Sequence, residues 1–384
     1  MRFRILVTIV SLMKCGQQLF GLIFLLFVFG IFPDQPSQDP ISRHRFYILG
    51  WTINQGLSKT WNKVTIAVPQ DTVERRKILR AYFLRGEAVP QELAEEIIAK
   101  EIEETLGSHG ISFPPVLIKI SPPPTLLVIS PRWEIKAVET IILNPGISDS
   151  QREEIESFIT AKKPAYSALV VDLGGLALLP AVVNRYTLAQ TIEAAAHEWC
   201  HHYLSLAPLG KNYGSLKTLN ENVCVLVGRE LADEILGKYE LTTVAHPTAE
   251  SSQLNFNEEM RKIRKKVDGL LSIGEVEQAE VFMEEQRQFL SQYFPIRKLN
   301  QAYFAFYGSY DDGAAGGDPT TAQVAQIRAK SAGLKEFLEK IRQVGNSEDF
   351  RKLFHQEGLP QAPTIASNAM VSGLFPLSLL LFPR

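Results

Sequence analysis

The chain has 384 residues, of which 45% are hydrophobic, 21% charged and 9% aromatic, and these proportions exclude a largely disordered protein. Its 40 basic and 42 acidic residues leave a formal net charge of −2, which gives no electrostatic reason to expect a nucleic-acid partner. Only three cysteines occur, so a disulfide-stapled scaffold and a four-cysteine structural zinc module are excluded.

The N-terminal segment is strongly apolar. Residues 19–32 contain only apolar side chains and glycine, and residues 15–32 come close to the about 20 residues that a helix needs to cross a bilayer. Basic residues precede this run and acidic residues follow it, at Arg2, Arg4, Lys14, Asp34 and Asp39. The positive-inside rule then keeps the N-terminus in the cytoplasm. We predict that residues 1–33 form a single-pass anchor in the cell membrane, with the rest of the chain outside.

A cleaved signal peptide is the alternative for this segment. A start at Met13 would give a short basic region followed by an apolar run, although no Ala-x-Ala cleavage site follows. In that case the chain would be secreted.

Residues 34–65 are predicted to form a juxtamembrane linker and a helix. The linker is rich in Pro, Ser, Gln and Asp, and apolar residues at helical spacing follow from Phe46 to Trp61. Trp51 and Trp61 suit either the membrane interface or a packed core.

An α+β domain is expected over residues 66–355. Amphipathic spacing predicts helices at residues 72–85, 90–106, 148–161, 257–267 and 274–293. Runs rich in Ile, Val and Leu, divided by prolines, predict short strands at residues 116–120, 126–129, 135–143 and 167–173. Strands of this length imply a small mixed sheet.

The most informative segment begins at Thr187. This residue forms a Thr-x-x-Gln capping box with Gln190, in front of an alanine-rich run at residues 189–204. The pattern predicts a helix.

Within this helix, residues 197–201 read HEWCH, an HExxH arrangement. A spacing of four residues turns a helix by about 400°, so the imidazoles of His197 and His201 project from one face and can bind a single cation. Glu198 projects beside them, where it can take a proton from a water at the metal.

Zinc hydrolases use three protein ligands and keep one position open, so a third donor is needed. Glu221, within the sequence LNENV at residues 219–223, is expected to open a second apolar-periodic helix that runs to Leu236. An HExxH motif followed by an Asn-Glu pair that opens the next helix resembles the gluzincin metallopeptidases, the thermolysin-like enzymes and their aminopeptidase relatives. Nineteen residues separate His201 from Glu221, which is the thermolysin-like spacing.

The resemblance covers residues 187–236. It implies a zincin-like catalytic domain in which Zn²⁺ is bound by His197, His201 and Glu221, and in which Glu198 is the general base for hydrolysis of a peptide bond.

This chain departs from the family pattern at Val225, where thermolysin-like enzymes carry an aspartate that orients a ligand histidine. Another acceptor must do this, or the histidines are held less tightly. His202 is rotated by about 140° from His197 and cannot join the site. Glu230, nine residues beyond Glu221, is the alternative third ligand.

The cysteines of this region leave three readings open. Cys200 follows His197 by three residues, and Cys224 follows Glu221 by three, so each thiol lies close to a ligand's face of its helix. They are core residues, a disulfide between the two helices, or metal ligands.

Residues 168–183 precede the capping box and read as an apolar strand, a turn at Gly174 and Gly175, and a second extended stretch interrupted by Pro180. In gluzincins a strand before the HExxH helix lines the cleft and pairs with extended substrate, and the resemblance implies that role here. A buried hairpin that serves the core explains the same residues.

Residues 299–310 carry five aromatic side chains and precede a glycine-rich loop. A packed aromatic helix accounts for most of them. Gluzincins stabilise the oxyanion with a Tyr or His donor, and the resemblance makes Tyr310 the candidate, with His246 and Tyr213 as the other donors to test.

The tail, residues 356–384, is rich in proline and ends in an apolar run at residues 370–382. That run is too short, and too interrupted by proline, to span a membrane.

The sequence therefore predicts a membrane-anchored, extracytoplasmic zinc-dependent peptidase whose partner is a peptide or protein substrate. The alternatives are a zinc hydrolase that acts on a non-peptide substrate, and a non-catalytic membrane-anchored protein whose zinc site is structural or lost. The sequence indicates neither the substrate nor the oligomeric state.

Overall fold

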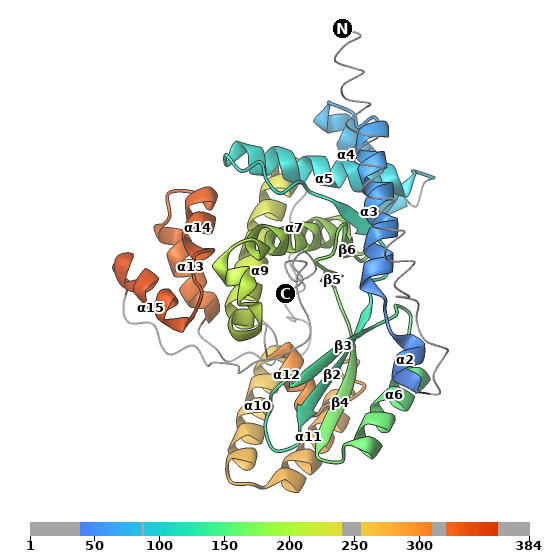
Figure 1. Ribbon diagram of the computed structural model, residues 1–384, viewed down its shortest axis with the longest axis vertical. Helices are drawn as coiled ribbons and strands as arrows, with labels where there is room; N and C mark the ends of the chain where they lie inside the picture. The colour runs from blue at the N-terminus through green and yellow to red at the C-terminus, as the bar shows by residue number, and fades with distance from the viewer. Residues whose placement is uncertain (1–38, 86–87, 240–254, 309–319, 360–384) are drawn as a thin grey trace, which may run out of the picture. The chain divides into compact units, whose positions relative to one another are not determined.

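The computed structural model describes residues 39–85, 88–239, 255–308 and 320–359. The chain divides into two compact units, residues 1–44 and residues 45–384. The described part of the first unit contains the short helix α2, Pro40–His44. All other elements belong to the second unit (Figure 1).

No helix in the described ranges is both long enough and apolar enough to cross a membrane. The predicted anchor at residues 1–33 lies outside those ranges. So do Tyr310, His246 and the apolar run at residues 370–382.

The second unit opens with helices, close to where amphipathic spacing predicts them: α3 (Ile48–Thr65), α4 (Thr72–Arg80), the π-helical turn η1 (Ala81–Arg85) and α5 (Gln91–Ser108). Lys59 of α3 is buried, and its Nζ lies 3.2 Å from Oε1 of Glu96 and also pairs with Glu95, both on α5. This buried ion pair fixes α3 against α5. On another face of α3, Trp61 is 70% exposed and is not a core residue.

Two three-stranded sheets form within the described residues, so the predicted α+β class is confirmed. In the first, β2 (Thr125–Pro131) is central and pairs antiparallel with β3 (Glu139–Leu143) and β4 (Tyr166–Asp172). The second is mixed: β6 (Ala181–Val183) pairs parallel with β1 (Ile118–Ile120) and antiparallel with β5 (Gly175–Leu176). Every residue of β2 is buried, and its sequence is apolar except for Thr125 and Ser130.

Of the two alternatives for residues 168–183, the single buried hairpin is wrong. β4 pairs with β2 in the first sheet, whereas the chain after Gly174 crosses to the second sheet, where β5 pairs with β6. Local sequence predicted the extended segments correctly, but strand pairing depends on distant partners that a local pattern does not reveal.

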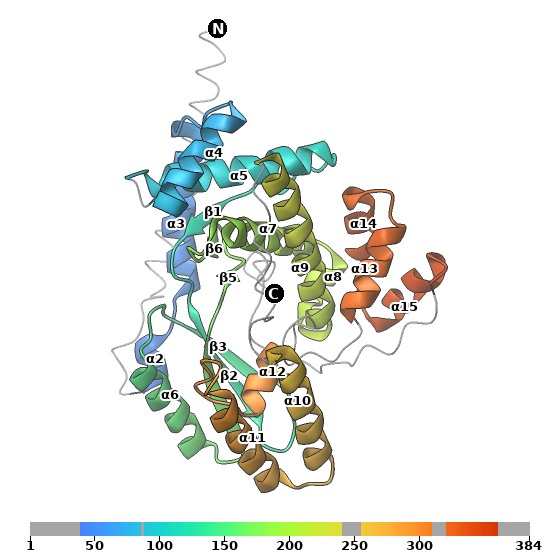
Figure 2. The same ribbon diagram turned by 180° about the vertical axis from the view of Figure 1, so that it is seen from behind.

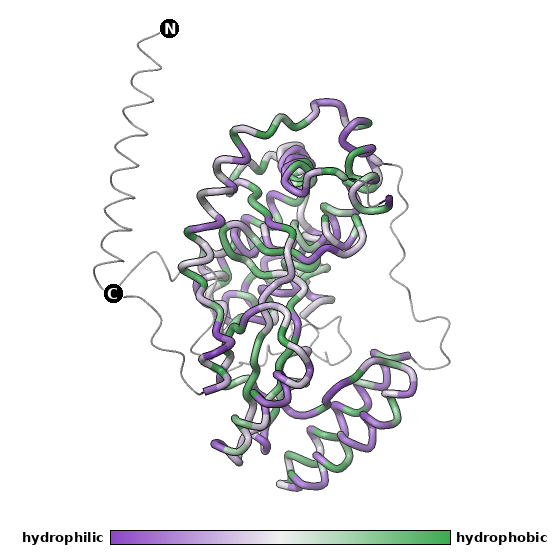
Figure 3. The backbone as a smooth tube through the Cα atoms, turned by 90° about the vertical axis from the view of Figure 1, so that its right-hand side faces the viewer, coloured by the Kyte–Doolittle hydropathy of each residue, from purple (hydrophilic) through white to green (hydrophobic). Residues whose placement is uncertain are grey.

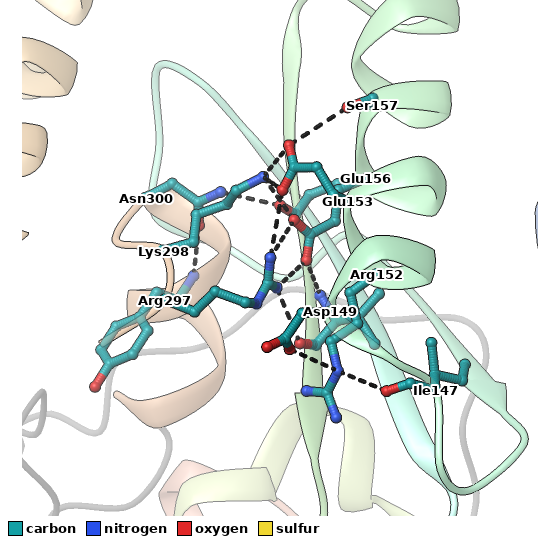
Figure 4. A network of polar contacts seen from close by, with 12 residues as sticks. Ile147, Asp149, Arg152, Glu153, Glu156, Ser157, Arg297, Lys298 and Asn300 are labelled. Atoms are coloured by element: carbon teal, nitrogen blue, oxygen red, sulfur yellow. Dashed lines mark hydrogen bonds and ion pairs between the residues drawn. The ribbon is translucent and has the colours of Figure 1, made fainter. Parts of the chain in front are cut away.

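Helix α6 (Asp149–Lys162) begins with a capping box formed by Ser148 and Gln151 and packs beside β4. Figure 4 shows Glu156 of α6 facing Arg297 and Lys298. Its carboxylate lies 2.5 Å from Lys298 Nζ and accepts a hydrogen bond of 2.7 Å from the backbone N–H of Val170. The buried Glu156 thus joins α6, β4 and the segment that leads into α12.

The remaining helices are numbered α7 to α15 in chain order (Figures 1 and 2). They are α7 (Leu188–Ser205), α8 (Pro208–Lys211), α9 (Tyr213–Lys238), α10 (Phe256–Ser272), α11 (Val276–Leu290), α12 (Gln301–Tyr307), α13 (Thr320–Lys330), α14 (Leu334–Ile341) and α15 (Ser347–Gln356). Hydrophilic and hydrophobic residues alternate along the helical parts of the tube in Figure 3, as amphipathic packing requires.

Helix α9 begins earlier than predicted, at Tyr213 rather than at Glu221. Leu216 interrupts it with non-helical backbone angles (φ −118°, ψ 24°). Glu221 therefore lies inside the helix, one turn beyond this break, and not at its first position.

Apolar side chains form separate cores. The largest is built around α5, α7 and α9 with β1, β6 and the helices α13 to α15. A second lies between the β2–β4 sheet and α12, and a third is formed mainly by α10 and α11. The HExxH segment belongs to the first core.

Helices α7 and α9 make the most extensive contact between elements, and Gly228 of α9 allows it. An ideal Cβ at Gly228 would lie 2.9 Å from the carbonyl oxygen of Glu193 and 3.2 Å from Cβ of His197, both on α7. Because one neighbour is backbone, it cannot rotate away as a flexible side chain would. The missing Cβ therefore sets the separation of the two helices.

We expect Gly228→Ala to lower the free energy of unfolding by about 1–3 kcal/mol through overpacking, although alanine intrinsically favours a helix by about 1 kcal/mol. Gly237 on the same helix is the matched control, since an ideal Cβ there has no neighbour within 4 Å. Gly237→Ala should leave stability unchanged or raise it slightly. Urea denaturation of both variants checks the contrast, and equal stabilities would contradict this account of the contact.

Candidate metal centre

Helix α7 carries the HExxH motif, and its predicted capping box is confirmed. The backbone N–H of Gln190 donates to Thr187 Oγ1 at 3.3 Å, and the Gln190 side chain accepts from the backbone N–H of Thr187 at 3.3 Å. Ala195 and Ala196 are fully buried, and such small side chains let neighbouring elements approach the helix. The helix therefore presents the motif residues from a packed and fixed backbone.

The three predicted ligand residues come together. Nε2 of His197 lies 3.0 Å from Nε2 of His201. Oε2 of Glu221 lies 3.5 Å from the first of these nitrogens and 3.6 Å from the second. One ligand atom from each residue thus falls within 4.8 Å of the others, a grouping that can hold a metal ion.

The atoms of this group fit a cation. Glu221 Oε2 is buried and has no hydrogen-bond partner, and the two Nε2 atoms face each other in the same space. Two imidazole nitrogens and one carboxylate oxygen are a donor set typical of Zn²⁺ and similar divalent ions. A bound cation would satisfy the orphaned oxygen and separate the two nitrogens that face each other.

Electrostatics favour a charged carboxylate at the centre. Burial alone raises the pKa of Glu221, but the neighbouring imidazoles hold that pKa well below its usual range. Burial alone lowers the pKa of His201, but the charge of Glu221 raises it to about 9. Since the carboxylate stabilises a positive charge at His201, it can do the same for a metal cation in this space.

Neighbouring side chains orient the ligands. Asn220 Oδ1 lies 2.8 Å from His201 Nδ1 and accepts a hydrogen bond from its N–H, which directs Nε2 towards the candidate metal position. Cys224 Sγ is 3.4 Å from the same nitrogen. The Tyr213 hydroxyl donates to Glu221 Oε1 and so directs Oε2 towards the histidines. Asn220 thus supplies the acceptor for a candidate ligand histidine, which the apolar side chain of Val225 could not.

Glu198 lies beside the centre and is not one of its three ligands. Its side chain is buried against Gly175 of β5: an ideal Cβ at Gly175 would overlap Glu198 Oε1 and lie 3.0 Å from Cδ. Burial raises the pKa of the Glu198 carboxyl more than the nearby histidines lower it, so the pKa lies above its usual range. The carboxylate can therefore accept a proton more readily than an exposed glutamate.

The other candidates of this region have different partners. Glu230 forms a bidentate ion pair with Arg328 of α13, at 2.6 and 2.9 Å, so the prediction of Glu230 as the alternative ligand is wrong. His202 is buried away from the group, as expected, and hydrogen-bonds the backbone of Leu178. Burial lowers the pKa of His202 to about 4, so it is a neutral packing residue.

Cys200 and Cys224 are free and fully buried in the first core. They are core residues, which is one of the three open readings, and the predicted alternative of a disulfide is wrong.

Three features of the site were not predicted: the roles of Asn220 and Gly175, and the position of Lys217. Lys217 Nζ lies over the ring of Phe306 at 5.3 Å, and burial lowers its pKa while the charge of Glu221 raises it. The Asn-Glu pair in the sequence could have indicated the role of Asn220. The positions of Gly175 and Lys217 could not be predicted, because they depend on contacts between distant segments.

A comparison of the chain with protein-family models, with curated proteins and with solved structures found no match. The metal centre is therefore inferred from its own geometry.

We expect the purified chain to bind about one divalent metal ion, because three converging buried donors form a preorganised site. His201→Ala should weaken the affinity by more than about 100-fold, since removal of an orienting neighbour alone costs 10- to 100-fold. Glu230→Ala is the control and should keep the metal. Metal analysis by mass spectrometry decides, and full retention by both His201→Ala and Glu221→Ala would overturn the assignment.

Proposed function

We propose that the chain is a zinc-dependent peptidase that hydrolyses peptide bonds in a peptide or protein substrate. The observation that carries the proposal is the position of Glu198, which lies against Gly175 next to three converging ligands without being one of them. A structural zinc site does not require a carboxylate beside its ligands. A hydrolytic site requires such a carboxylate as the general base.

In this proposal each side chain has a separate task. His197, His201 and Glu221 would hold Zn²⁺, which when bound supplies Lewis acidity that polarises a carbonyl group and acidifies water. Glu198 accepts the proton of the attacking water and passes it to the leaving amine. Asn220 holds the imidazole of His201 in the orientation that this requires.

Strand β5 provides a place for the substrate backbone. It pairs with β6 alone among the described strands, so its other edge has backbone groups available to an extended peptide. Gly175 belongs to this strand and contacts Glu198. A peptide paired with β5 would therefore lie beside the proposed base.

An oxyanion donor completes the proposed mechanism. Tyr310 remains the candidate from the sequence. The hydroxyl of Tyr213 donates to Glu221, so its first task is to orient a ligand.

We further propose that residues 1–33 anchor the chain in the cell membrane, with the catalytic domain on the extracytoplasmic side. This rests on the apolar run of residues 19–32 and the basic residues before it. If that segment is removed as a signal peptide, the same domain is secreted.

Glu198→Gln should bind zinc with normal affinity yet lose peptidase activity by about 10²–10⁴-fold, the usual contribution of a positioned general base. Glu221→Gln should instead weaken the metal affinity, because an amide is a poorer zinc ligand than a carboxylate. A peptide-library digest with mass-spectrometric readout, together with metal titration, separates the two effects. Unchanged hydrolysis by Glu198→Gln would rule out this mechanism, and hydrolysis of esters or other non-peptide substrates alone would favour the alternative zinc hydrolase.

A second pair of variants tests the position of the base without changing it. Gly175→Ala should push the Glu198 carboxylate away from the site and reduce activity by at least about tenfold. Gly174→Ala is the control, since an ideal Cβ there has no neighbour within 4 Å. Zinc content should stay normal in both variants. Equal activity of the two would show that the contact with Gly175 does not place Glu198.

A further inference from the structure

A hollow lies on the opposite side of α7 from the candidate metal centre. It has a volume of about 250 Å³ and is bounded by the loop at residues 110–114, the C-terminal end of α7 and helix α14. Tyr203, which lines it, follows His201 by two residues and is therefore rotated from it by about 200° around the helix. A ligand in this hollow would not touch the three metal ligands.

The walls of the hollow are largely apolar, and two large side chains at it are left in contact with water. Phe113 of the loop is 61% exposed, and Leu206 at the end of α7 is 52% exposed. Neighbouring exposed apolar residues around a concave surface are a common mark of a ligand site.

The hollow also contains two cationic side chains that lack strong partners. The Arg342 guanidinium stacks on the ring of Tyr203, 4.6 Å from its centroid, and its Nε is buried with no hydrogen-bond partner. No described carboxylate pairs with Arg342. The carboxylate closest to Lys335 Nζ is that of Glu339, 4.0 Å away on the same helix and largely exposed, so this pair is weak.

The hollow is held in shape by α7 itself. Trp199 of α7 donates a hydrogen bond of 2.9 Å from Nε1 to the carbonyl oxygen of Pro114, at the end of the loop that forms one wall. The backbone N–H of Leu209, just after α7, donates to the carbonyl oxygen of Arg342 at 3.1 Å. A preformed site of this kind binds without first ordering its walls.

We propose that this hollow binds a carboxylate that carries one apolar group, with the carboxylate between Lys335 and Arg342 and the apolar group against Phe113 and Leu206. An anionic acceptor would pair with the Arg342 guanidinium and the Lys335 ammonium, which both line the hollow, through charge-assisted hydrogen bonds. The volume is below the 300–1,000 Å³ typical of pockets for drug-sized ligands, so the apolar group is about as large as one aromatic side chain. A ligand with both groups can be a free acid or the carboxyl terminus of a peptide.

The test is isothermal titration of the full chain with phenylacetate, and with the neutral analogue 2-phenylacetamide. Phenylacetate should bind saturably and at least tenfold more tightly than the amide, and added salt should weaken it. Arg342→Met should weaken phenylacetate binding at least tenfold and Lys335→Met about threefold. Lys330→Met, which removes an exposed lysine of α13, is the control and should bind like the parent chain.

Three further arms identify the location and the source of the ligand. His201→Ala should bind phenylacetate normally, which separates this hollow from the metal centre and from the success of the proposed peptidase function. An acetylated Gly-Gly-Phe peptide with a free carboxyl terminus, compared with its amidated form, shows whether peptide carboxyl termini also enter. Leu206→Glu should abolish binding without unfolding the chain, as checked by its melting temperature. Equal binding of acid and amide, unchanged binding by Arg342→Met, or no saturable binding would overturn the proposal.

Discussion

The close approach of α9 to α7 at Gly228 determines the geometry of the metal centre. Gly228 and Glu221 are seven residues apart, which returns them to nearly the same face of α9. The face that touches α7 near His197 is therefore the face that carries the third ligand. The alanine-rich surface of α7 and the missing side chain at Gly228 act together: small residues bring the two backbones near enough for short-range polar contacts between them.

A polar group buried in such a contact is costly unless its hydrogen bonds are satisfied. Asn220 and Tyr213 satisfy one atom each of His201 and Glu221, and the remaining atoms face the space between the ligands. The acceptor at His201 is a neutral amide and not a carboxylate. A cation bound here would therefore keep more of its positive charge, and polarise a bound oxygen more strongly, than one beside an extra aspartate.

Much of this arrangement could be predicted locally. The capping box at Thr187 and the helical period predicted α7, and the spacing of His197, His201 and Glu221 predicted the ligand group that the structure brings together. The start of α9 was missed because the helix continues across the backbone break at Leu216, which no local sequence pattern indicates. Strand pairing and the contact of Gly175 with Glu198 were not predictable, since both depend on segments that meet only in the folded chain.

All three candidate ligands lie on α7 and α9, the helices of the first core, whereas the β2–β4 sheet with α12, and the pair α10 and α11, form cores of their own. A metal that binds the native state stabilises it by mass action, by about 2.7 kcal/mol at 100 times its dissociation constant. That increment applies directly to the unfolding of the first core. A metal bound at this centre would therefore stabilise the first core directly, and the other two cores only through their contacts with it.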